Sequence, residues 1–171
     1  NKLELGNYST ISEAPLSSTI VKRIESYFSR LNYDYQSKYF LSASVRRDGN
    51  SFFAEDKRWA NFWSVGGAWR ITSEDFFHVK NVNELKLKVS YGKVGNDAVG
   101  SYAYQGGYIQ NNNAQEPGYI YAVIPNKDLT WESLNNLNAG IEFSLFKSRI
   151  SGYAQYYNKV SSGLVFAVPQ P

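Results

Sequence analysis

The sequence predicts an all-β protein built from antiparallel, up-and-down strands. Apolar and polar side chains alternate with a period of two in six segments, as they do on the two faces of a strand. Short and long connections alternate between these segments. Aromatic residues make up 16% of the chain, with 14 tyrosines, and such residues are enriched in strands and at boundaries between apolar and wet regions.

The first two predicted strands span residues 23–35 and 39–47 and are joined by the short turn QSK. Both place tyrosine, leucine and valine at odd positions and mostly polar residues at even positions. Phe28 is the exception among the polar positions of the first strand. The polar, glycine-containing stretch that follows the second strand predicts a longer loop.

The next two strands are predicted at residues 59–71 and 85–96. The third carries tryptophan at positions 59, 63 and 69, and its internal glycines permit curvature or close packing. The segment TSEDFF after it predicts a short helical turn capped by Ser73. The fourth strand, LKLKVSYGKVGN, has leucine, valine and tyrosine on one parity and lysine, serine and glycine on the other.

The alternation disappears between Gly95 and about Asp128, where glycine, asparagine, glutamine and tyrosine dominate. A connection of this length inside a compact unit is functional or is ordered in part by its own aromatics. The last two strands are predicted at residues 130–146 and 150–160, joined by the tight turn KSR.

The apolar parity has two possible environments, because it would meet a core in a soluble sheet and lipid in an outer-membrane barrel. Short turns at one end and long loops at the other are typical of the barrel. The aromatics also gather near both ends of the strands, as in the girdles at lipid–water boundaries. A sandwich with one decorated end could imitate the loop pattern.

The composition excludes several classes of protein. The net charge of +3 is spread along the chain, so no basic stripe indicates nucleic-acid binding. The absence of cysteine excludes disulfides and thiolate metal sites. No apolar run approaches the roughly 20 residues of a membrane helix. Because the chain begins at Asn1 and lacks methionine, we expect an excised, processed or incomplete piece.

Enzymatic chemistry finds little support, so the prediction is a protein with no catalytic residues, metal site or cofactor. The single histidine, His78, is predicted to pack in a turn, and one imidazole cannot form a usual metal set. The adjacent carboxylates of Glu55 and Asp56, like those of Glu74 and Asp75, favour solvated turn roles over acid–base catalysis.

Several segments together carry a family resemblance, above all SVRRDGNS, AWRITSEDFF and VSYGKVGN. In their order they resemble the C-terminal barrel half of SusC/RagA-type TonB-dependent outer-membrane transporters of Bacteroidetes, from about Arg23 to Lys159. The resemblance implies a segment of a 22-stranded transmembrane barrel that surrounds an N-terminal plug. It also implies import of glycans or peptides with a SusD-like surface lipoprotein, powered by TonB through an N-terminal region absent from this chain.

This interpretation divides the chain into three parts. Residues 1–22 are expected to form a loop or irregular lead-in, residues 23–160 about six barrel strands with an extracellular loop at 95–129, and residues 161–171 the start of the next loop or strand. The alternatives are a soluble β-sandwich that binds carbohydrate and a structural adhesin, the latter weakened by the lack of an internal repeat.

The long loop supplies the candidates for substrate contact, because tyrosine rings offer stacking faces and amides both donate and accept hydrogen bonds. These candidates are Tyr102, Tyr104, Tyr108, Asn111, Asn112, Asn113, Tyr119 and Tyr121. The other interpretation is that the tyrosines pack the loop against itself or against the lipoprotein.

Charged residues on the polar parity are candidates for a lumen-facing surface. They are Arg30, Arg46, Arg70, Lys86, Lys88, Glu132 and Glu142. A lysine or arginine turned toward lipid near the midplane costs about 2–4 kcal/mol, so we expect these side chains to form interstrand ion pairs or to face the plug. The same side chains are candidates for tuning selectivity.

Overall fold

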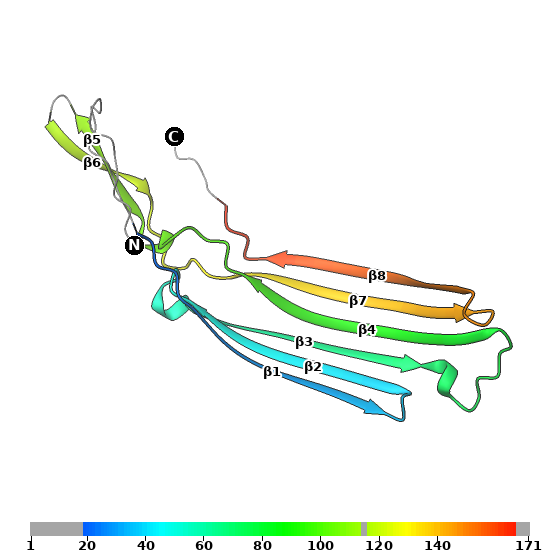
Figure 1. Cartoon of the computed structure of the whole chain (residues 1–171). Coiled ribbons are helices and arrows are strands. Elements are labelled where there is room, and N and C mark those ends of the chain that lie inside the picture. Colours follow the sequence, from blue (N-terminus) through cyan, green and yellow to red (C-terminus); the bar gives the residue numbers. More distant parts are fainter. Residues whose placement is uncertain (1–18, 114–115, 167–171) are drawn as a thin grey trace, which may run out of the picture.

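The computed structural model describes residues 19–113 and 116–166, without the side chains of 111–117, and its main element is one antiparallel sheet of six strands (Figure 1). The strand order is β1-β2-β3-β4-β7-β8, so the sheet follows the chain except for an insertion between β4 and β7. Its strands are β1 (Ile24–Tyr35), β2 (Tyr39–Asn50), β3 (Trp59–Arg70), β4 (Val82–Asn96), β7 (Glu132–Leu145) and β8 (Ile150–Ser162). The predicted all-β, up-and-down fold is confirmed.

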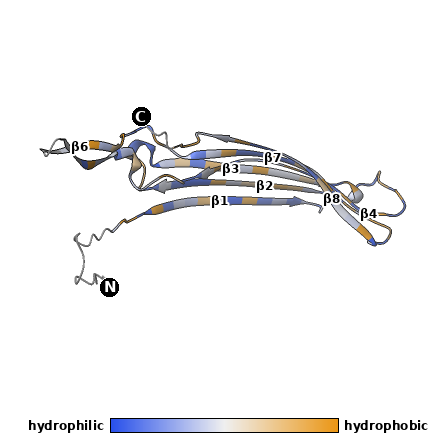
Figure 2. Cartoon of the chain, turned by 90° about the horizontal axis from the view of Figure 1, so that it is seen from above, coloured by the Kyte–Doolittle hydropathy of each residue, from blue (hydrophilic) through white to orange (hydrophobic). Residues whose placement is uncertain are grey.

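Each strand has two chemically different faces, and the register aligns these faces across the sheet. One row of paired residues runs through Tyr33, Leu41, Gly67, Val89, Ala139 and Tyr156. We call this side the apolar face; it holds the odd positions of β1–β4 and β7 and the even positions of β8. The opposite side is the polar face. Figure 2 shows the resulting alternation of hydrophilic and hydrophobic residues along the strands.

The apolar face is not covered by a second layer within the described part of the chain. Val89 is 54% exposed and Ile141 43% exposed, although both are aliphatic residues in the middle of the sheet. The sheet therefore differs from the sandwich alternative, in which such residues would lie between two layers.

The short connections all lie at one end of the sheet, here named the turn end. The β1–β2 turn bends through Gln36 and Ser37, whose φ values of 51° and 54° are left-handed, as in tight hairpin turns. The prediction of a helical turn capped by Ser73 is wrong in its detail. The 3-10 turn η2 (Ile71–Ser73) begins earlier and has no side-chain cap.

The opposite end, here named the loop end, carries the two long connections. One is residues 51–58, with the 3-10 turn η1 (Glu55–Lys57). The other contains η3 (Ala103–Gln105) and a separate two-stranded hairpin of β5 (Gly107–Asn113) and β6 (Glu116–Val123), which projects beyond the sheet in Figure 1. No helix in the described residues is long and apolar enough to cross a membrane.

Candidate functional site

The polar face brings together all seven charged residues predicted for a lumen-facing surface. They are Arg30, Arg46, Arg70, Lys86, Lys88, Glu132 and Glu142. The register links them, for example from Arg70 to Lys86 on β4 and from Lys86 to Glu142 on β7. Because side chains alternate strictly along paired strands, a shift of one residue would turn all seven to the other face.

Near the turn end, the charges of this face are matched across strands. Lys88 Nζ lies 2.5 Å from Glu142 Oε2, and Arg70 Nε lies 3.5 Å from Glu84 Oε1. The Lys86 ammonium lies 4.3 Å from the ring centroid of Phe40, a cation–π contact. Their side chains are partly exposed, so each ion pair contributes about 0–1 kcal/mol.

Toward the loop end, the two remaining charged candidates with described contacts are also paired. Arg46 Nε lies 2.7 Å from Asp48 Oδ2 within the same strand, β2. The carboxylate of Glu132 accepts hydrogen bonds from Asn96 Nδ2 at 2.9 Å and from the Val165 amide at 2.8 Å. The structure thus places most of the predicted charges in interstrand contacts.

Between these two regions, the polar face of the inner strands β2, β3, β4 and β7 carries short, uncharged side chains, with Arg30 on β1 and Lys159 on β8 at the edges of the sheet. The hydroxyls of Ser44 and Ser64 lie 2.7 Å apart, and Asn138 Nδ2 donates to Ser90 Oγ at 3.4 Å. Gln155 Nε2 donates in turn to Asn138 Oδ1 at 3.1 Å. A hollow of about 590 Å³ borders this neutral belt. The belt presents hydrogen-bonding groups without a fixed charge.

A cluster of aromatic rings, which we call the aromatic cap, closes the loop end of the polar face. It consists of Phe52, Phe53, Phe62 and Trp131. Phe53 is fully buried, and its ring centroid lies 5.2 Å from that of Trp131. The Trp131 indole also donates to the Arg58 carbonyl at 3.1 Å. Sequence reasoning missed this cap, although two consecutive phenylalanines in a polar loop were a usable signal.

A buried polar network lies beside the aromatic cap. Asn50 is fully buried; its side-chain oxygen accepts from the Phe52 amide at 2.9 Å, and its Nδ2 donates to Asp97 Oδ2 at 2.8 Å. Lys22 Nζ lies 2.6 Å from the same carboxylate oxygen. Together with the aromatic cap, this network holds the 51–58 loop against the chain that leads into the hairpin.

The hairpin brings together three of the predicted substrate-contact tyrosines. Tyr108, Tyr119 and Tyr121 share one side of the hairpin and are 63%, 74% and 54% exposed. The hydroxyls of Tyr108 and Tyr121 lie 2.8 Å apart, and this hydrogen bond raises the pKa of Tyr108. Ile109 and Ile120 occupy the other side.

The other five candidates do not join this tyrosine face. Tyr102 packs against Phe52 with ring centroids 5.2 Å apart and donates to the Val21 carbonyl at 3.0 Å. Tyr104 accepts a hydrogen bond from Gln105 at 2.9 Å. The side chains of Asn111, Asn112 and Asn113 lie outside the described part of the structure.

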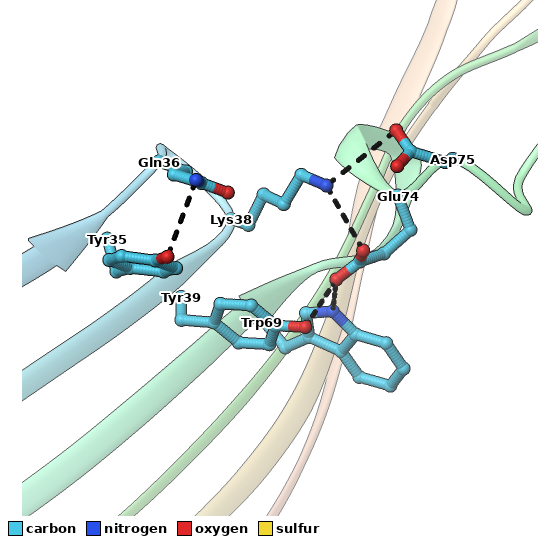
Figure 3. A network of polar contacts seen from close by, with 7 residues as sticks. All are labelled: Tyr35, Gln36, Lys38, Tyr39, Trp69, Glu74 and Asp75. Atoms are coloured by element: carbon cyan, nitrogen blue, oxygen red, sulfur yellow. Dashed lines mark hydrogen bonds and ion pairs between the residues drawn. The ribbon is translucent and has the colours of Figure 1, made fainter.

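A polar contact network surrounds Glu74 at the turn end (Figure 3). Its carboxylate accepts from the Tyr39 hydroxyl at 2.6 Å, the Trp69 indole at 2.9 Å and Lys38 Nζ at 3.3 Å. The hydrogen bond from Tyr39, followed by those from Trp69 and Lys38, holds the pKa of Glu74 below its usual value. The network fixes the turn after β3 onto the aromatic edge of the apolar face.

Chemistry-bearing clusters are sparse in the described residues. They include no group of three or more His, Asp or Glu side chains arranged to hold a metal ion. The fold and its two faces instead define a class of protein, the wall of a β-barrel whose strands have one apolar side and one polar side.

Comparisons with known proteins give this class a family. The family model described as "TonB dependent receptor-like, beta-barrel" matches residues 4–171. The chain therefore belongs to the TonB-dependent receptor family, as part of its outer-membrane β-barrel. This family consists of receptors rather than enzymes, which confirms the predictions of an outer-membrane, non-enzymatic protein.

Individual relatives agree with the family. The chain is 36% identical over 155 residues to the TonB-dependent receptor SusC of Bacteroides thetaiotaomicron, covering 85% of this chain and 16% of SusC. It is 34% identical over 185 residues to the TonB-dependent receptor P39 of Formosa agariphila, covering 100% of this chain and 18% of P39. Both relatives come from Bacteroidetes, as the resemblance implied.

A solved structure matches as well. The structure of the RagAB peptide transporter superposes with a TM-score of 0.78 at 32% identity, covering 88% of this chain and 17% of that chain. The chain thus spans less than a fifth of the proteins that it matches.

Proposed function

We propose that this chain is a wall segment of a TonB-dependent importer that takes up glycans or peptides together with a SusD-like lipoprotein. One observation carries the proposal: a single-layered sheet whose exposed face is apolar and whose opposite face holds matched charges. In water, such an exposed apolar face would promote aggregation, whereas contact with the hydrocarbon of a membrane is favourable for it.

We assign the apolar face to lipid and the polar face to the lumen. Val89, Ile141 and Leu137 would contact acyl chains, where burial of their apolar surface is favourable. The seven charged candidates, from Arg30 to Glu142, would face the lumen and its plug. The turn end would be periplasmic and the loop end extracellular, following the usual asymmetry of bacterial barrels.

The hairpin is our candidate for contact with substrate or with the lipoprotein. A two-stranded hairpin alone is marginal in water, and this one exposes both sides, which favours a partner in the assembled transporter. We assign substrate contact to Tyr108, Tyr119 and Tyr121, whose exposed rings and hydroxyls suit sugars or peptide groups. The aliphatic side with Ile109 and Ile120 is assigned to the lipoprotein.

The two substrate classes are supported by different observations. The RagAB relative is a peptide transporter, which favours peptides. The tyrosine face and the neutral belt carry hydroxyl and amide groups without fixed charge, which favours neutral glycans.

Uptake by the intact parent protein tests the proposal. Cells that carry the full-length protein as their sole candidate importer would be given labelled oligosaccharides and labelled peptides, with TonB active or inactivated. We expect TonB-dependent accumulation of one class. Accumulation of neither class, or equal accumulation without TonB, would contradict the proposal.

A further inference from the structure

The apolar face carries charged side chains only near the loop end. Along the six described strands they are Glu25 on β1, Arg47 on β2 and Lys93 on β4. Glu25 accepts a hydrogen bond from the Tyr27 hydroxyl. Arg47 and Lys93 form no ion pair with any described residue. Two free cations therefore lie on the side that we assign to lipid.

The register places Lys93 one pleat nearer the turn end than Arg47, an offset that the strand tilt of a membrane barrel would bring to one level in the membrane. Arg47 pairs with Asn61, Lys93 pairs with Trp63, and Asn158 lies in the row of Leu137, one pleat further toward the turn end. The position at which polar side chains begin on the apolar face thus moves toward the turn end by one pleat, or two residues, for every two strands. Strands tilted by about 35–45° give such a slope when the boundary is level.

An aromatic side chain holds Arg47 at this boundary, and Lys93 pairs with a tryptophan on the neighbouring strand. The guanidinium carbon of Arg47 lies 5.2 Å from the ring centroid of Trp59, which stacks on Tyr27 at 6.1 Å. Gly49 permits this arrangement, because a Cβ there would come within 3.0 Å of the indole. Lys93 is directly opposite Trp63. Tryptophan and tyrosine favour the interface between hydrocarbon and headgroups.

We propose that Arg47, Asn61 and Lys93 bind the phosphorylated disaccharide headgroup of lipid A, the membrane anchor of lipopolysaccharide. The loop end would face the outer leaflet, where this anionic glycolipid lies. The Arg47 and Lys93 Cα atoms are about 12 Å apart by strand spacing and rise, a span that suits a sugar pair phosphorylated at its ends. Arg47 provides a forked donor for one phosphate and Lys93 a point charge for another.

The neighbouring groups fit this assignment. The Asn61 side chain lies between the two cations on β3 and offers an amide to the sugars. Glu25 lies on β1, which neighbours the Arg47 strand on the side away from Lys93. Its carboxylate accepts a hydrogen bond from the Tyr27 hydroxyl. The inference rests on the proposed orientation of the two faces and is independent of the imported substrate.

The test measures binding of purified diphosphorylated lipid A to the full-length transporter in detergent, by native mass spectrometry. The double variant Arg47→Gln/Lys93→Gln removes both cations, and Lys147→Gln in the β7–β8 turn is the matched control. We expect the dissociation constant to rise about tenfold or more in the double variant, since a charged hydrogen bond is worth that much, and to stay unchanged in the control.

Further arms identify the phosphate source. Dephosphorylated lipid A should bind wild type and double variant equally and weakly, and neither inorganic phosphate nor phosphatidylglycerol should compete with lipid A. Arg47→Lys should retain part of the affinity. The proposal is overturned if the double variant binds lipid A like wild type, or if phosphatidylglycerol binds the site equally well.

Two readouts separate this result from misfolding and from loss of import. The heat-modifiable band of a folded barrel on gels verifies each variant, and the single variants provide intermediate affinities if the double variant does not fold. Substrate uptake should persist in every folded variant. Absence of uptake by the wild-type protein, with lipid A binding that still depends on Arg47 and Lys93, would count against the proposed function instead.

Discussion

The ring of Phe62 on β3 lies directly against the backbone of Gly95 on β4, with no space between them for a Cβ atom. The same ring packs against Trp131 with centroids 5.6 Å apart. Glycine at position 95 therefore allows the aromatic cap to close over the loop end of the sheet. The contact joins β3, β4 and the start of β7.

Replacing Gly95 by alanine should overpack this contact. We expect Gly95→Ala to destabilise the full-length protein by about 1–3 kcal/mol, measured as a lower thermal unfolding midpoint. Gly107→Ala is the matched control, because a Cβ there has no atom within 4 Å. Equal midpoints for the two variants would contradict the close packing at Gly95.

Truncation of the buried Phe53 side chain should leave a cavity in the aromatic cap. We expect Phe53→Ala to cost about 3–5 kcal/mol and to make the 51–58 loop sensitive to added protease. Phe146→Ala, at a half-exposed turn position, serves as the control and should change neither quantity. A protease pattern like that of wild type would show that the loop does not depend on the cap.

The Glu74 network predicts a pH dependence. Because hydrogen bonds, first from Tyr39 and then from Trp69, lower the folded-state pKa below 4.5, the charged form contributes stability above that pH. This contribution is lost as the pH falls through the folded-state pKa. We expect Glu74→Gln to unfold at a lower temperature than wild type at pH 7, with the gap closing as the pH falls below 4.5.

Asp75→Asn is the control for this titration, because the Asp75 side chain is fully exposed and touches the network only through Lys38 at 3.8 Å. Its unfolding temperature should follow wild type at every pH. A gap for Glu74→Gln that does not depend on pH would indicate that packing, and not charge, explains the effect.

The ion pair between Lys88 and Glu142 should behave as a coupled pair. Lys88→Glu places two carboxylates on neighbouring strands and should destabilise the protein, whereas the swapped double variant Lys88→Glu/Glu142→Lys should restore most of the loss. We expect a coupling energy of about 0.5–1 kcal/mol from a double-mutant cycle, since both side chains are half exposed. Additive effects would mean that the pair contributes nothing.

The tyrosine face predicts a binding defect without a folding defect. Tyr119 is 74% exposed, so Tyr119→Ala should leave the unfolding temperature unchanged while weakening substrate capture by about 1 kcal/mol, through loss of ring contact. Ile120→Ala on the opposite side of the hairpin is the control. If Ile120→Ala weakens direct substrate binding as much as Tyr119→Ala does, the two sides of the hairpin are not functionally distinct.

The six strands of the sheet were predictable because one face of the sheet carries apolar side chains and the other carries polar side chains. Val89 and Lys88, for example, follow each other in β4 and differ in polarity, so the period of two is visible without any tertiary information. The same pattern predicted the polar side of the sheet, and the structure added the pairing of Lys88 with Glu142 and of Arg70 with Glu84.

The hairpin and the aromatic cap were not predictable in the same way. The end of β6 does not alternate between apolar and polar residues, since it reads Tyr121, Ala122 and Val123. The pattern that marks a strand is therefore missing there. The cap depends on Phe53 meeting Trp131, residues that are far apart in the sequence. Long-range packing of this kind leaves only a weak local signal.

Because β5 and β6 pair only with each other, the hydrogen bonds of the six-stranded sheet do not depend on which residues the insertion holds. In the proposed orientation, this segment would be a replaceable insertion at the cell surface. Exchange between paralogues would alter surface recognition or antigenicity without resetting the strands below. It is also the natural position for building chimeras and for inserting an epitope tag.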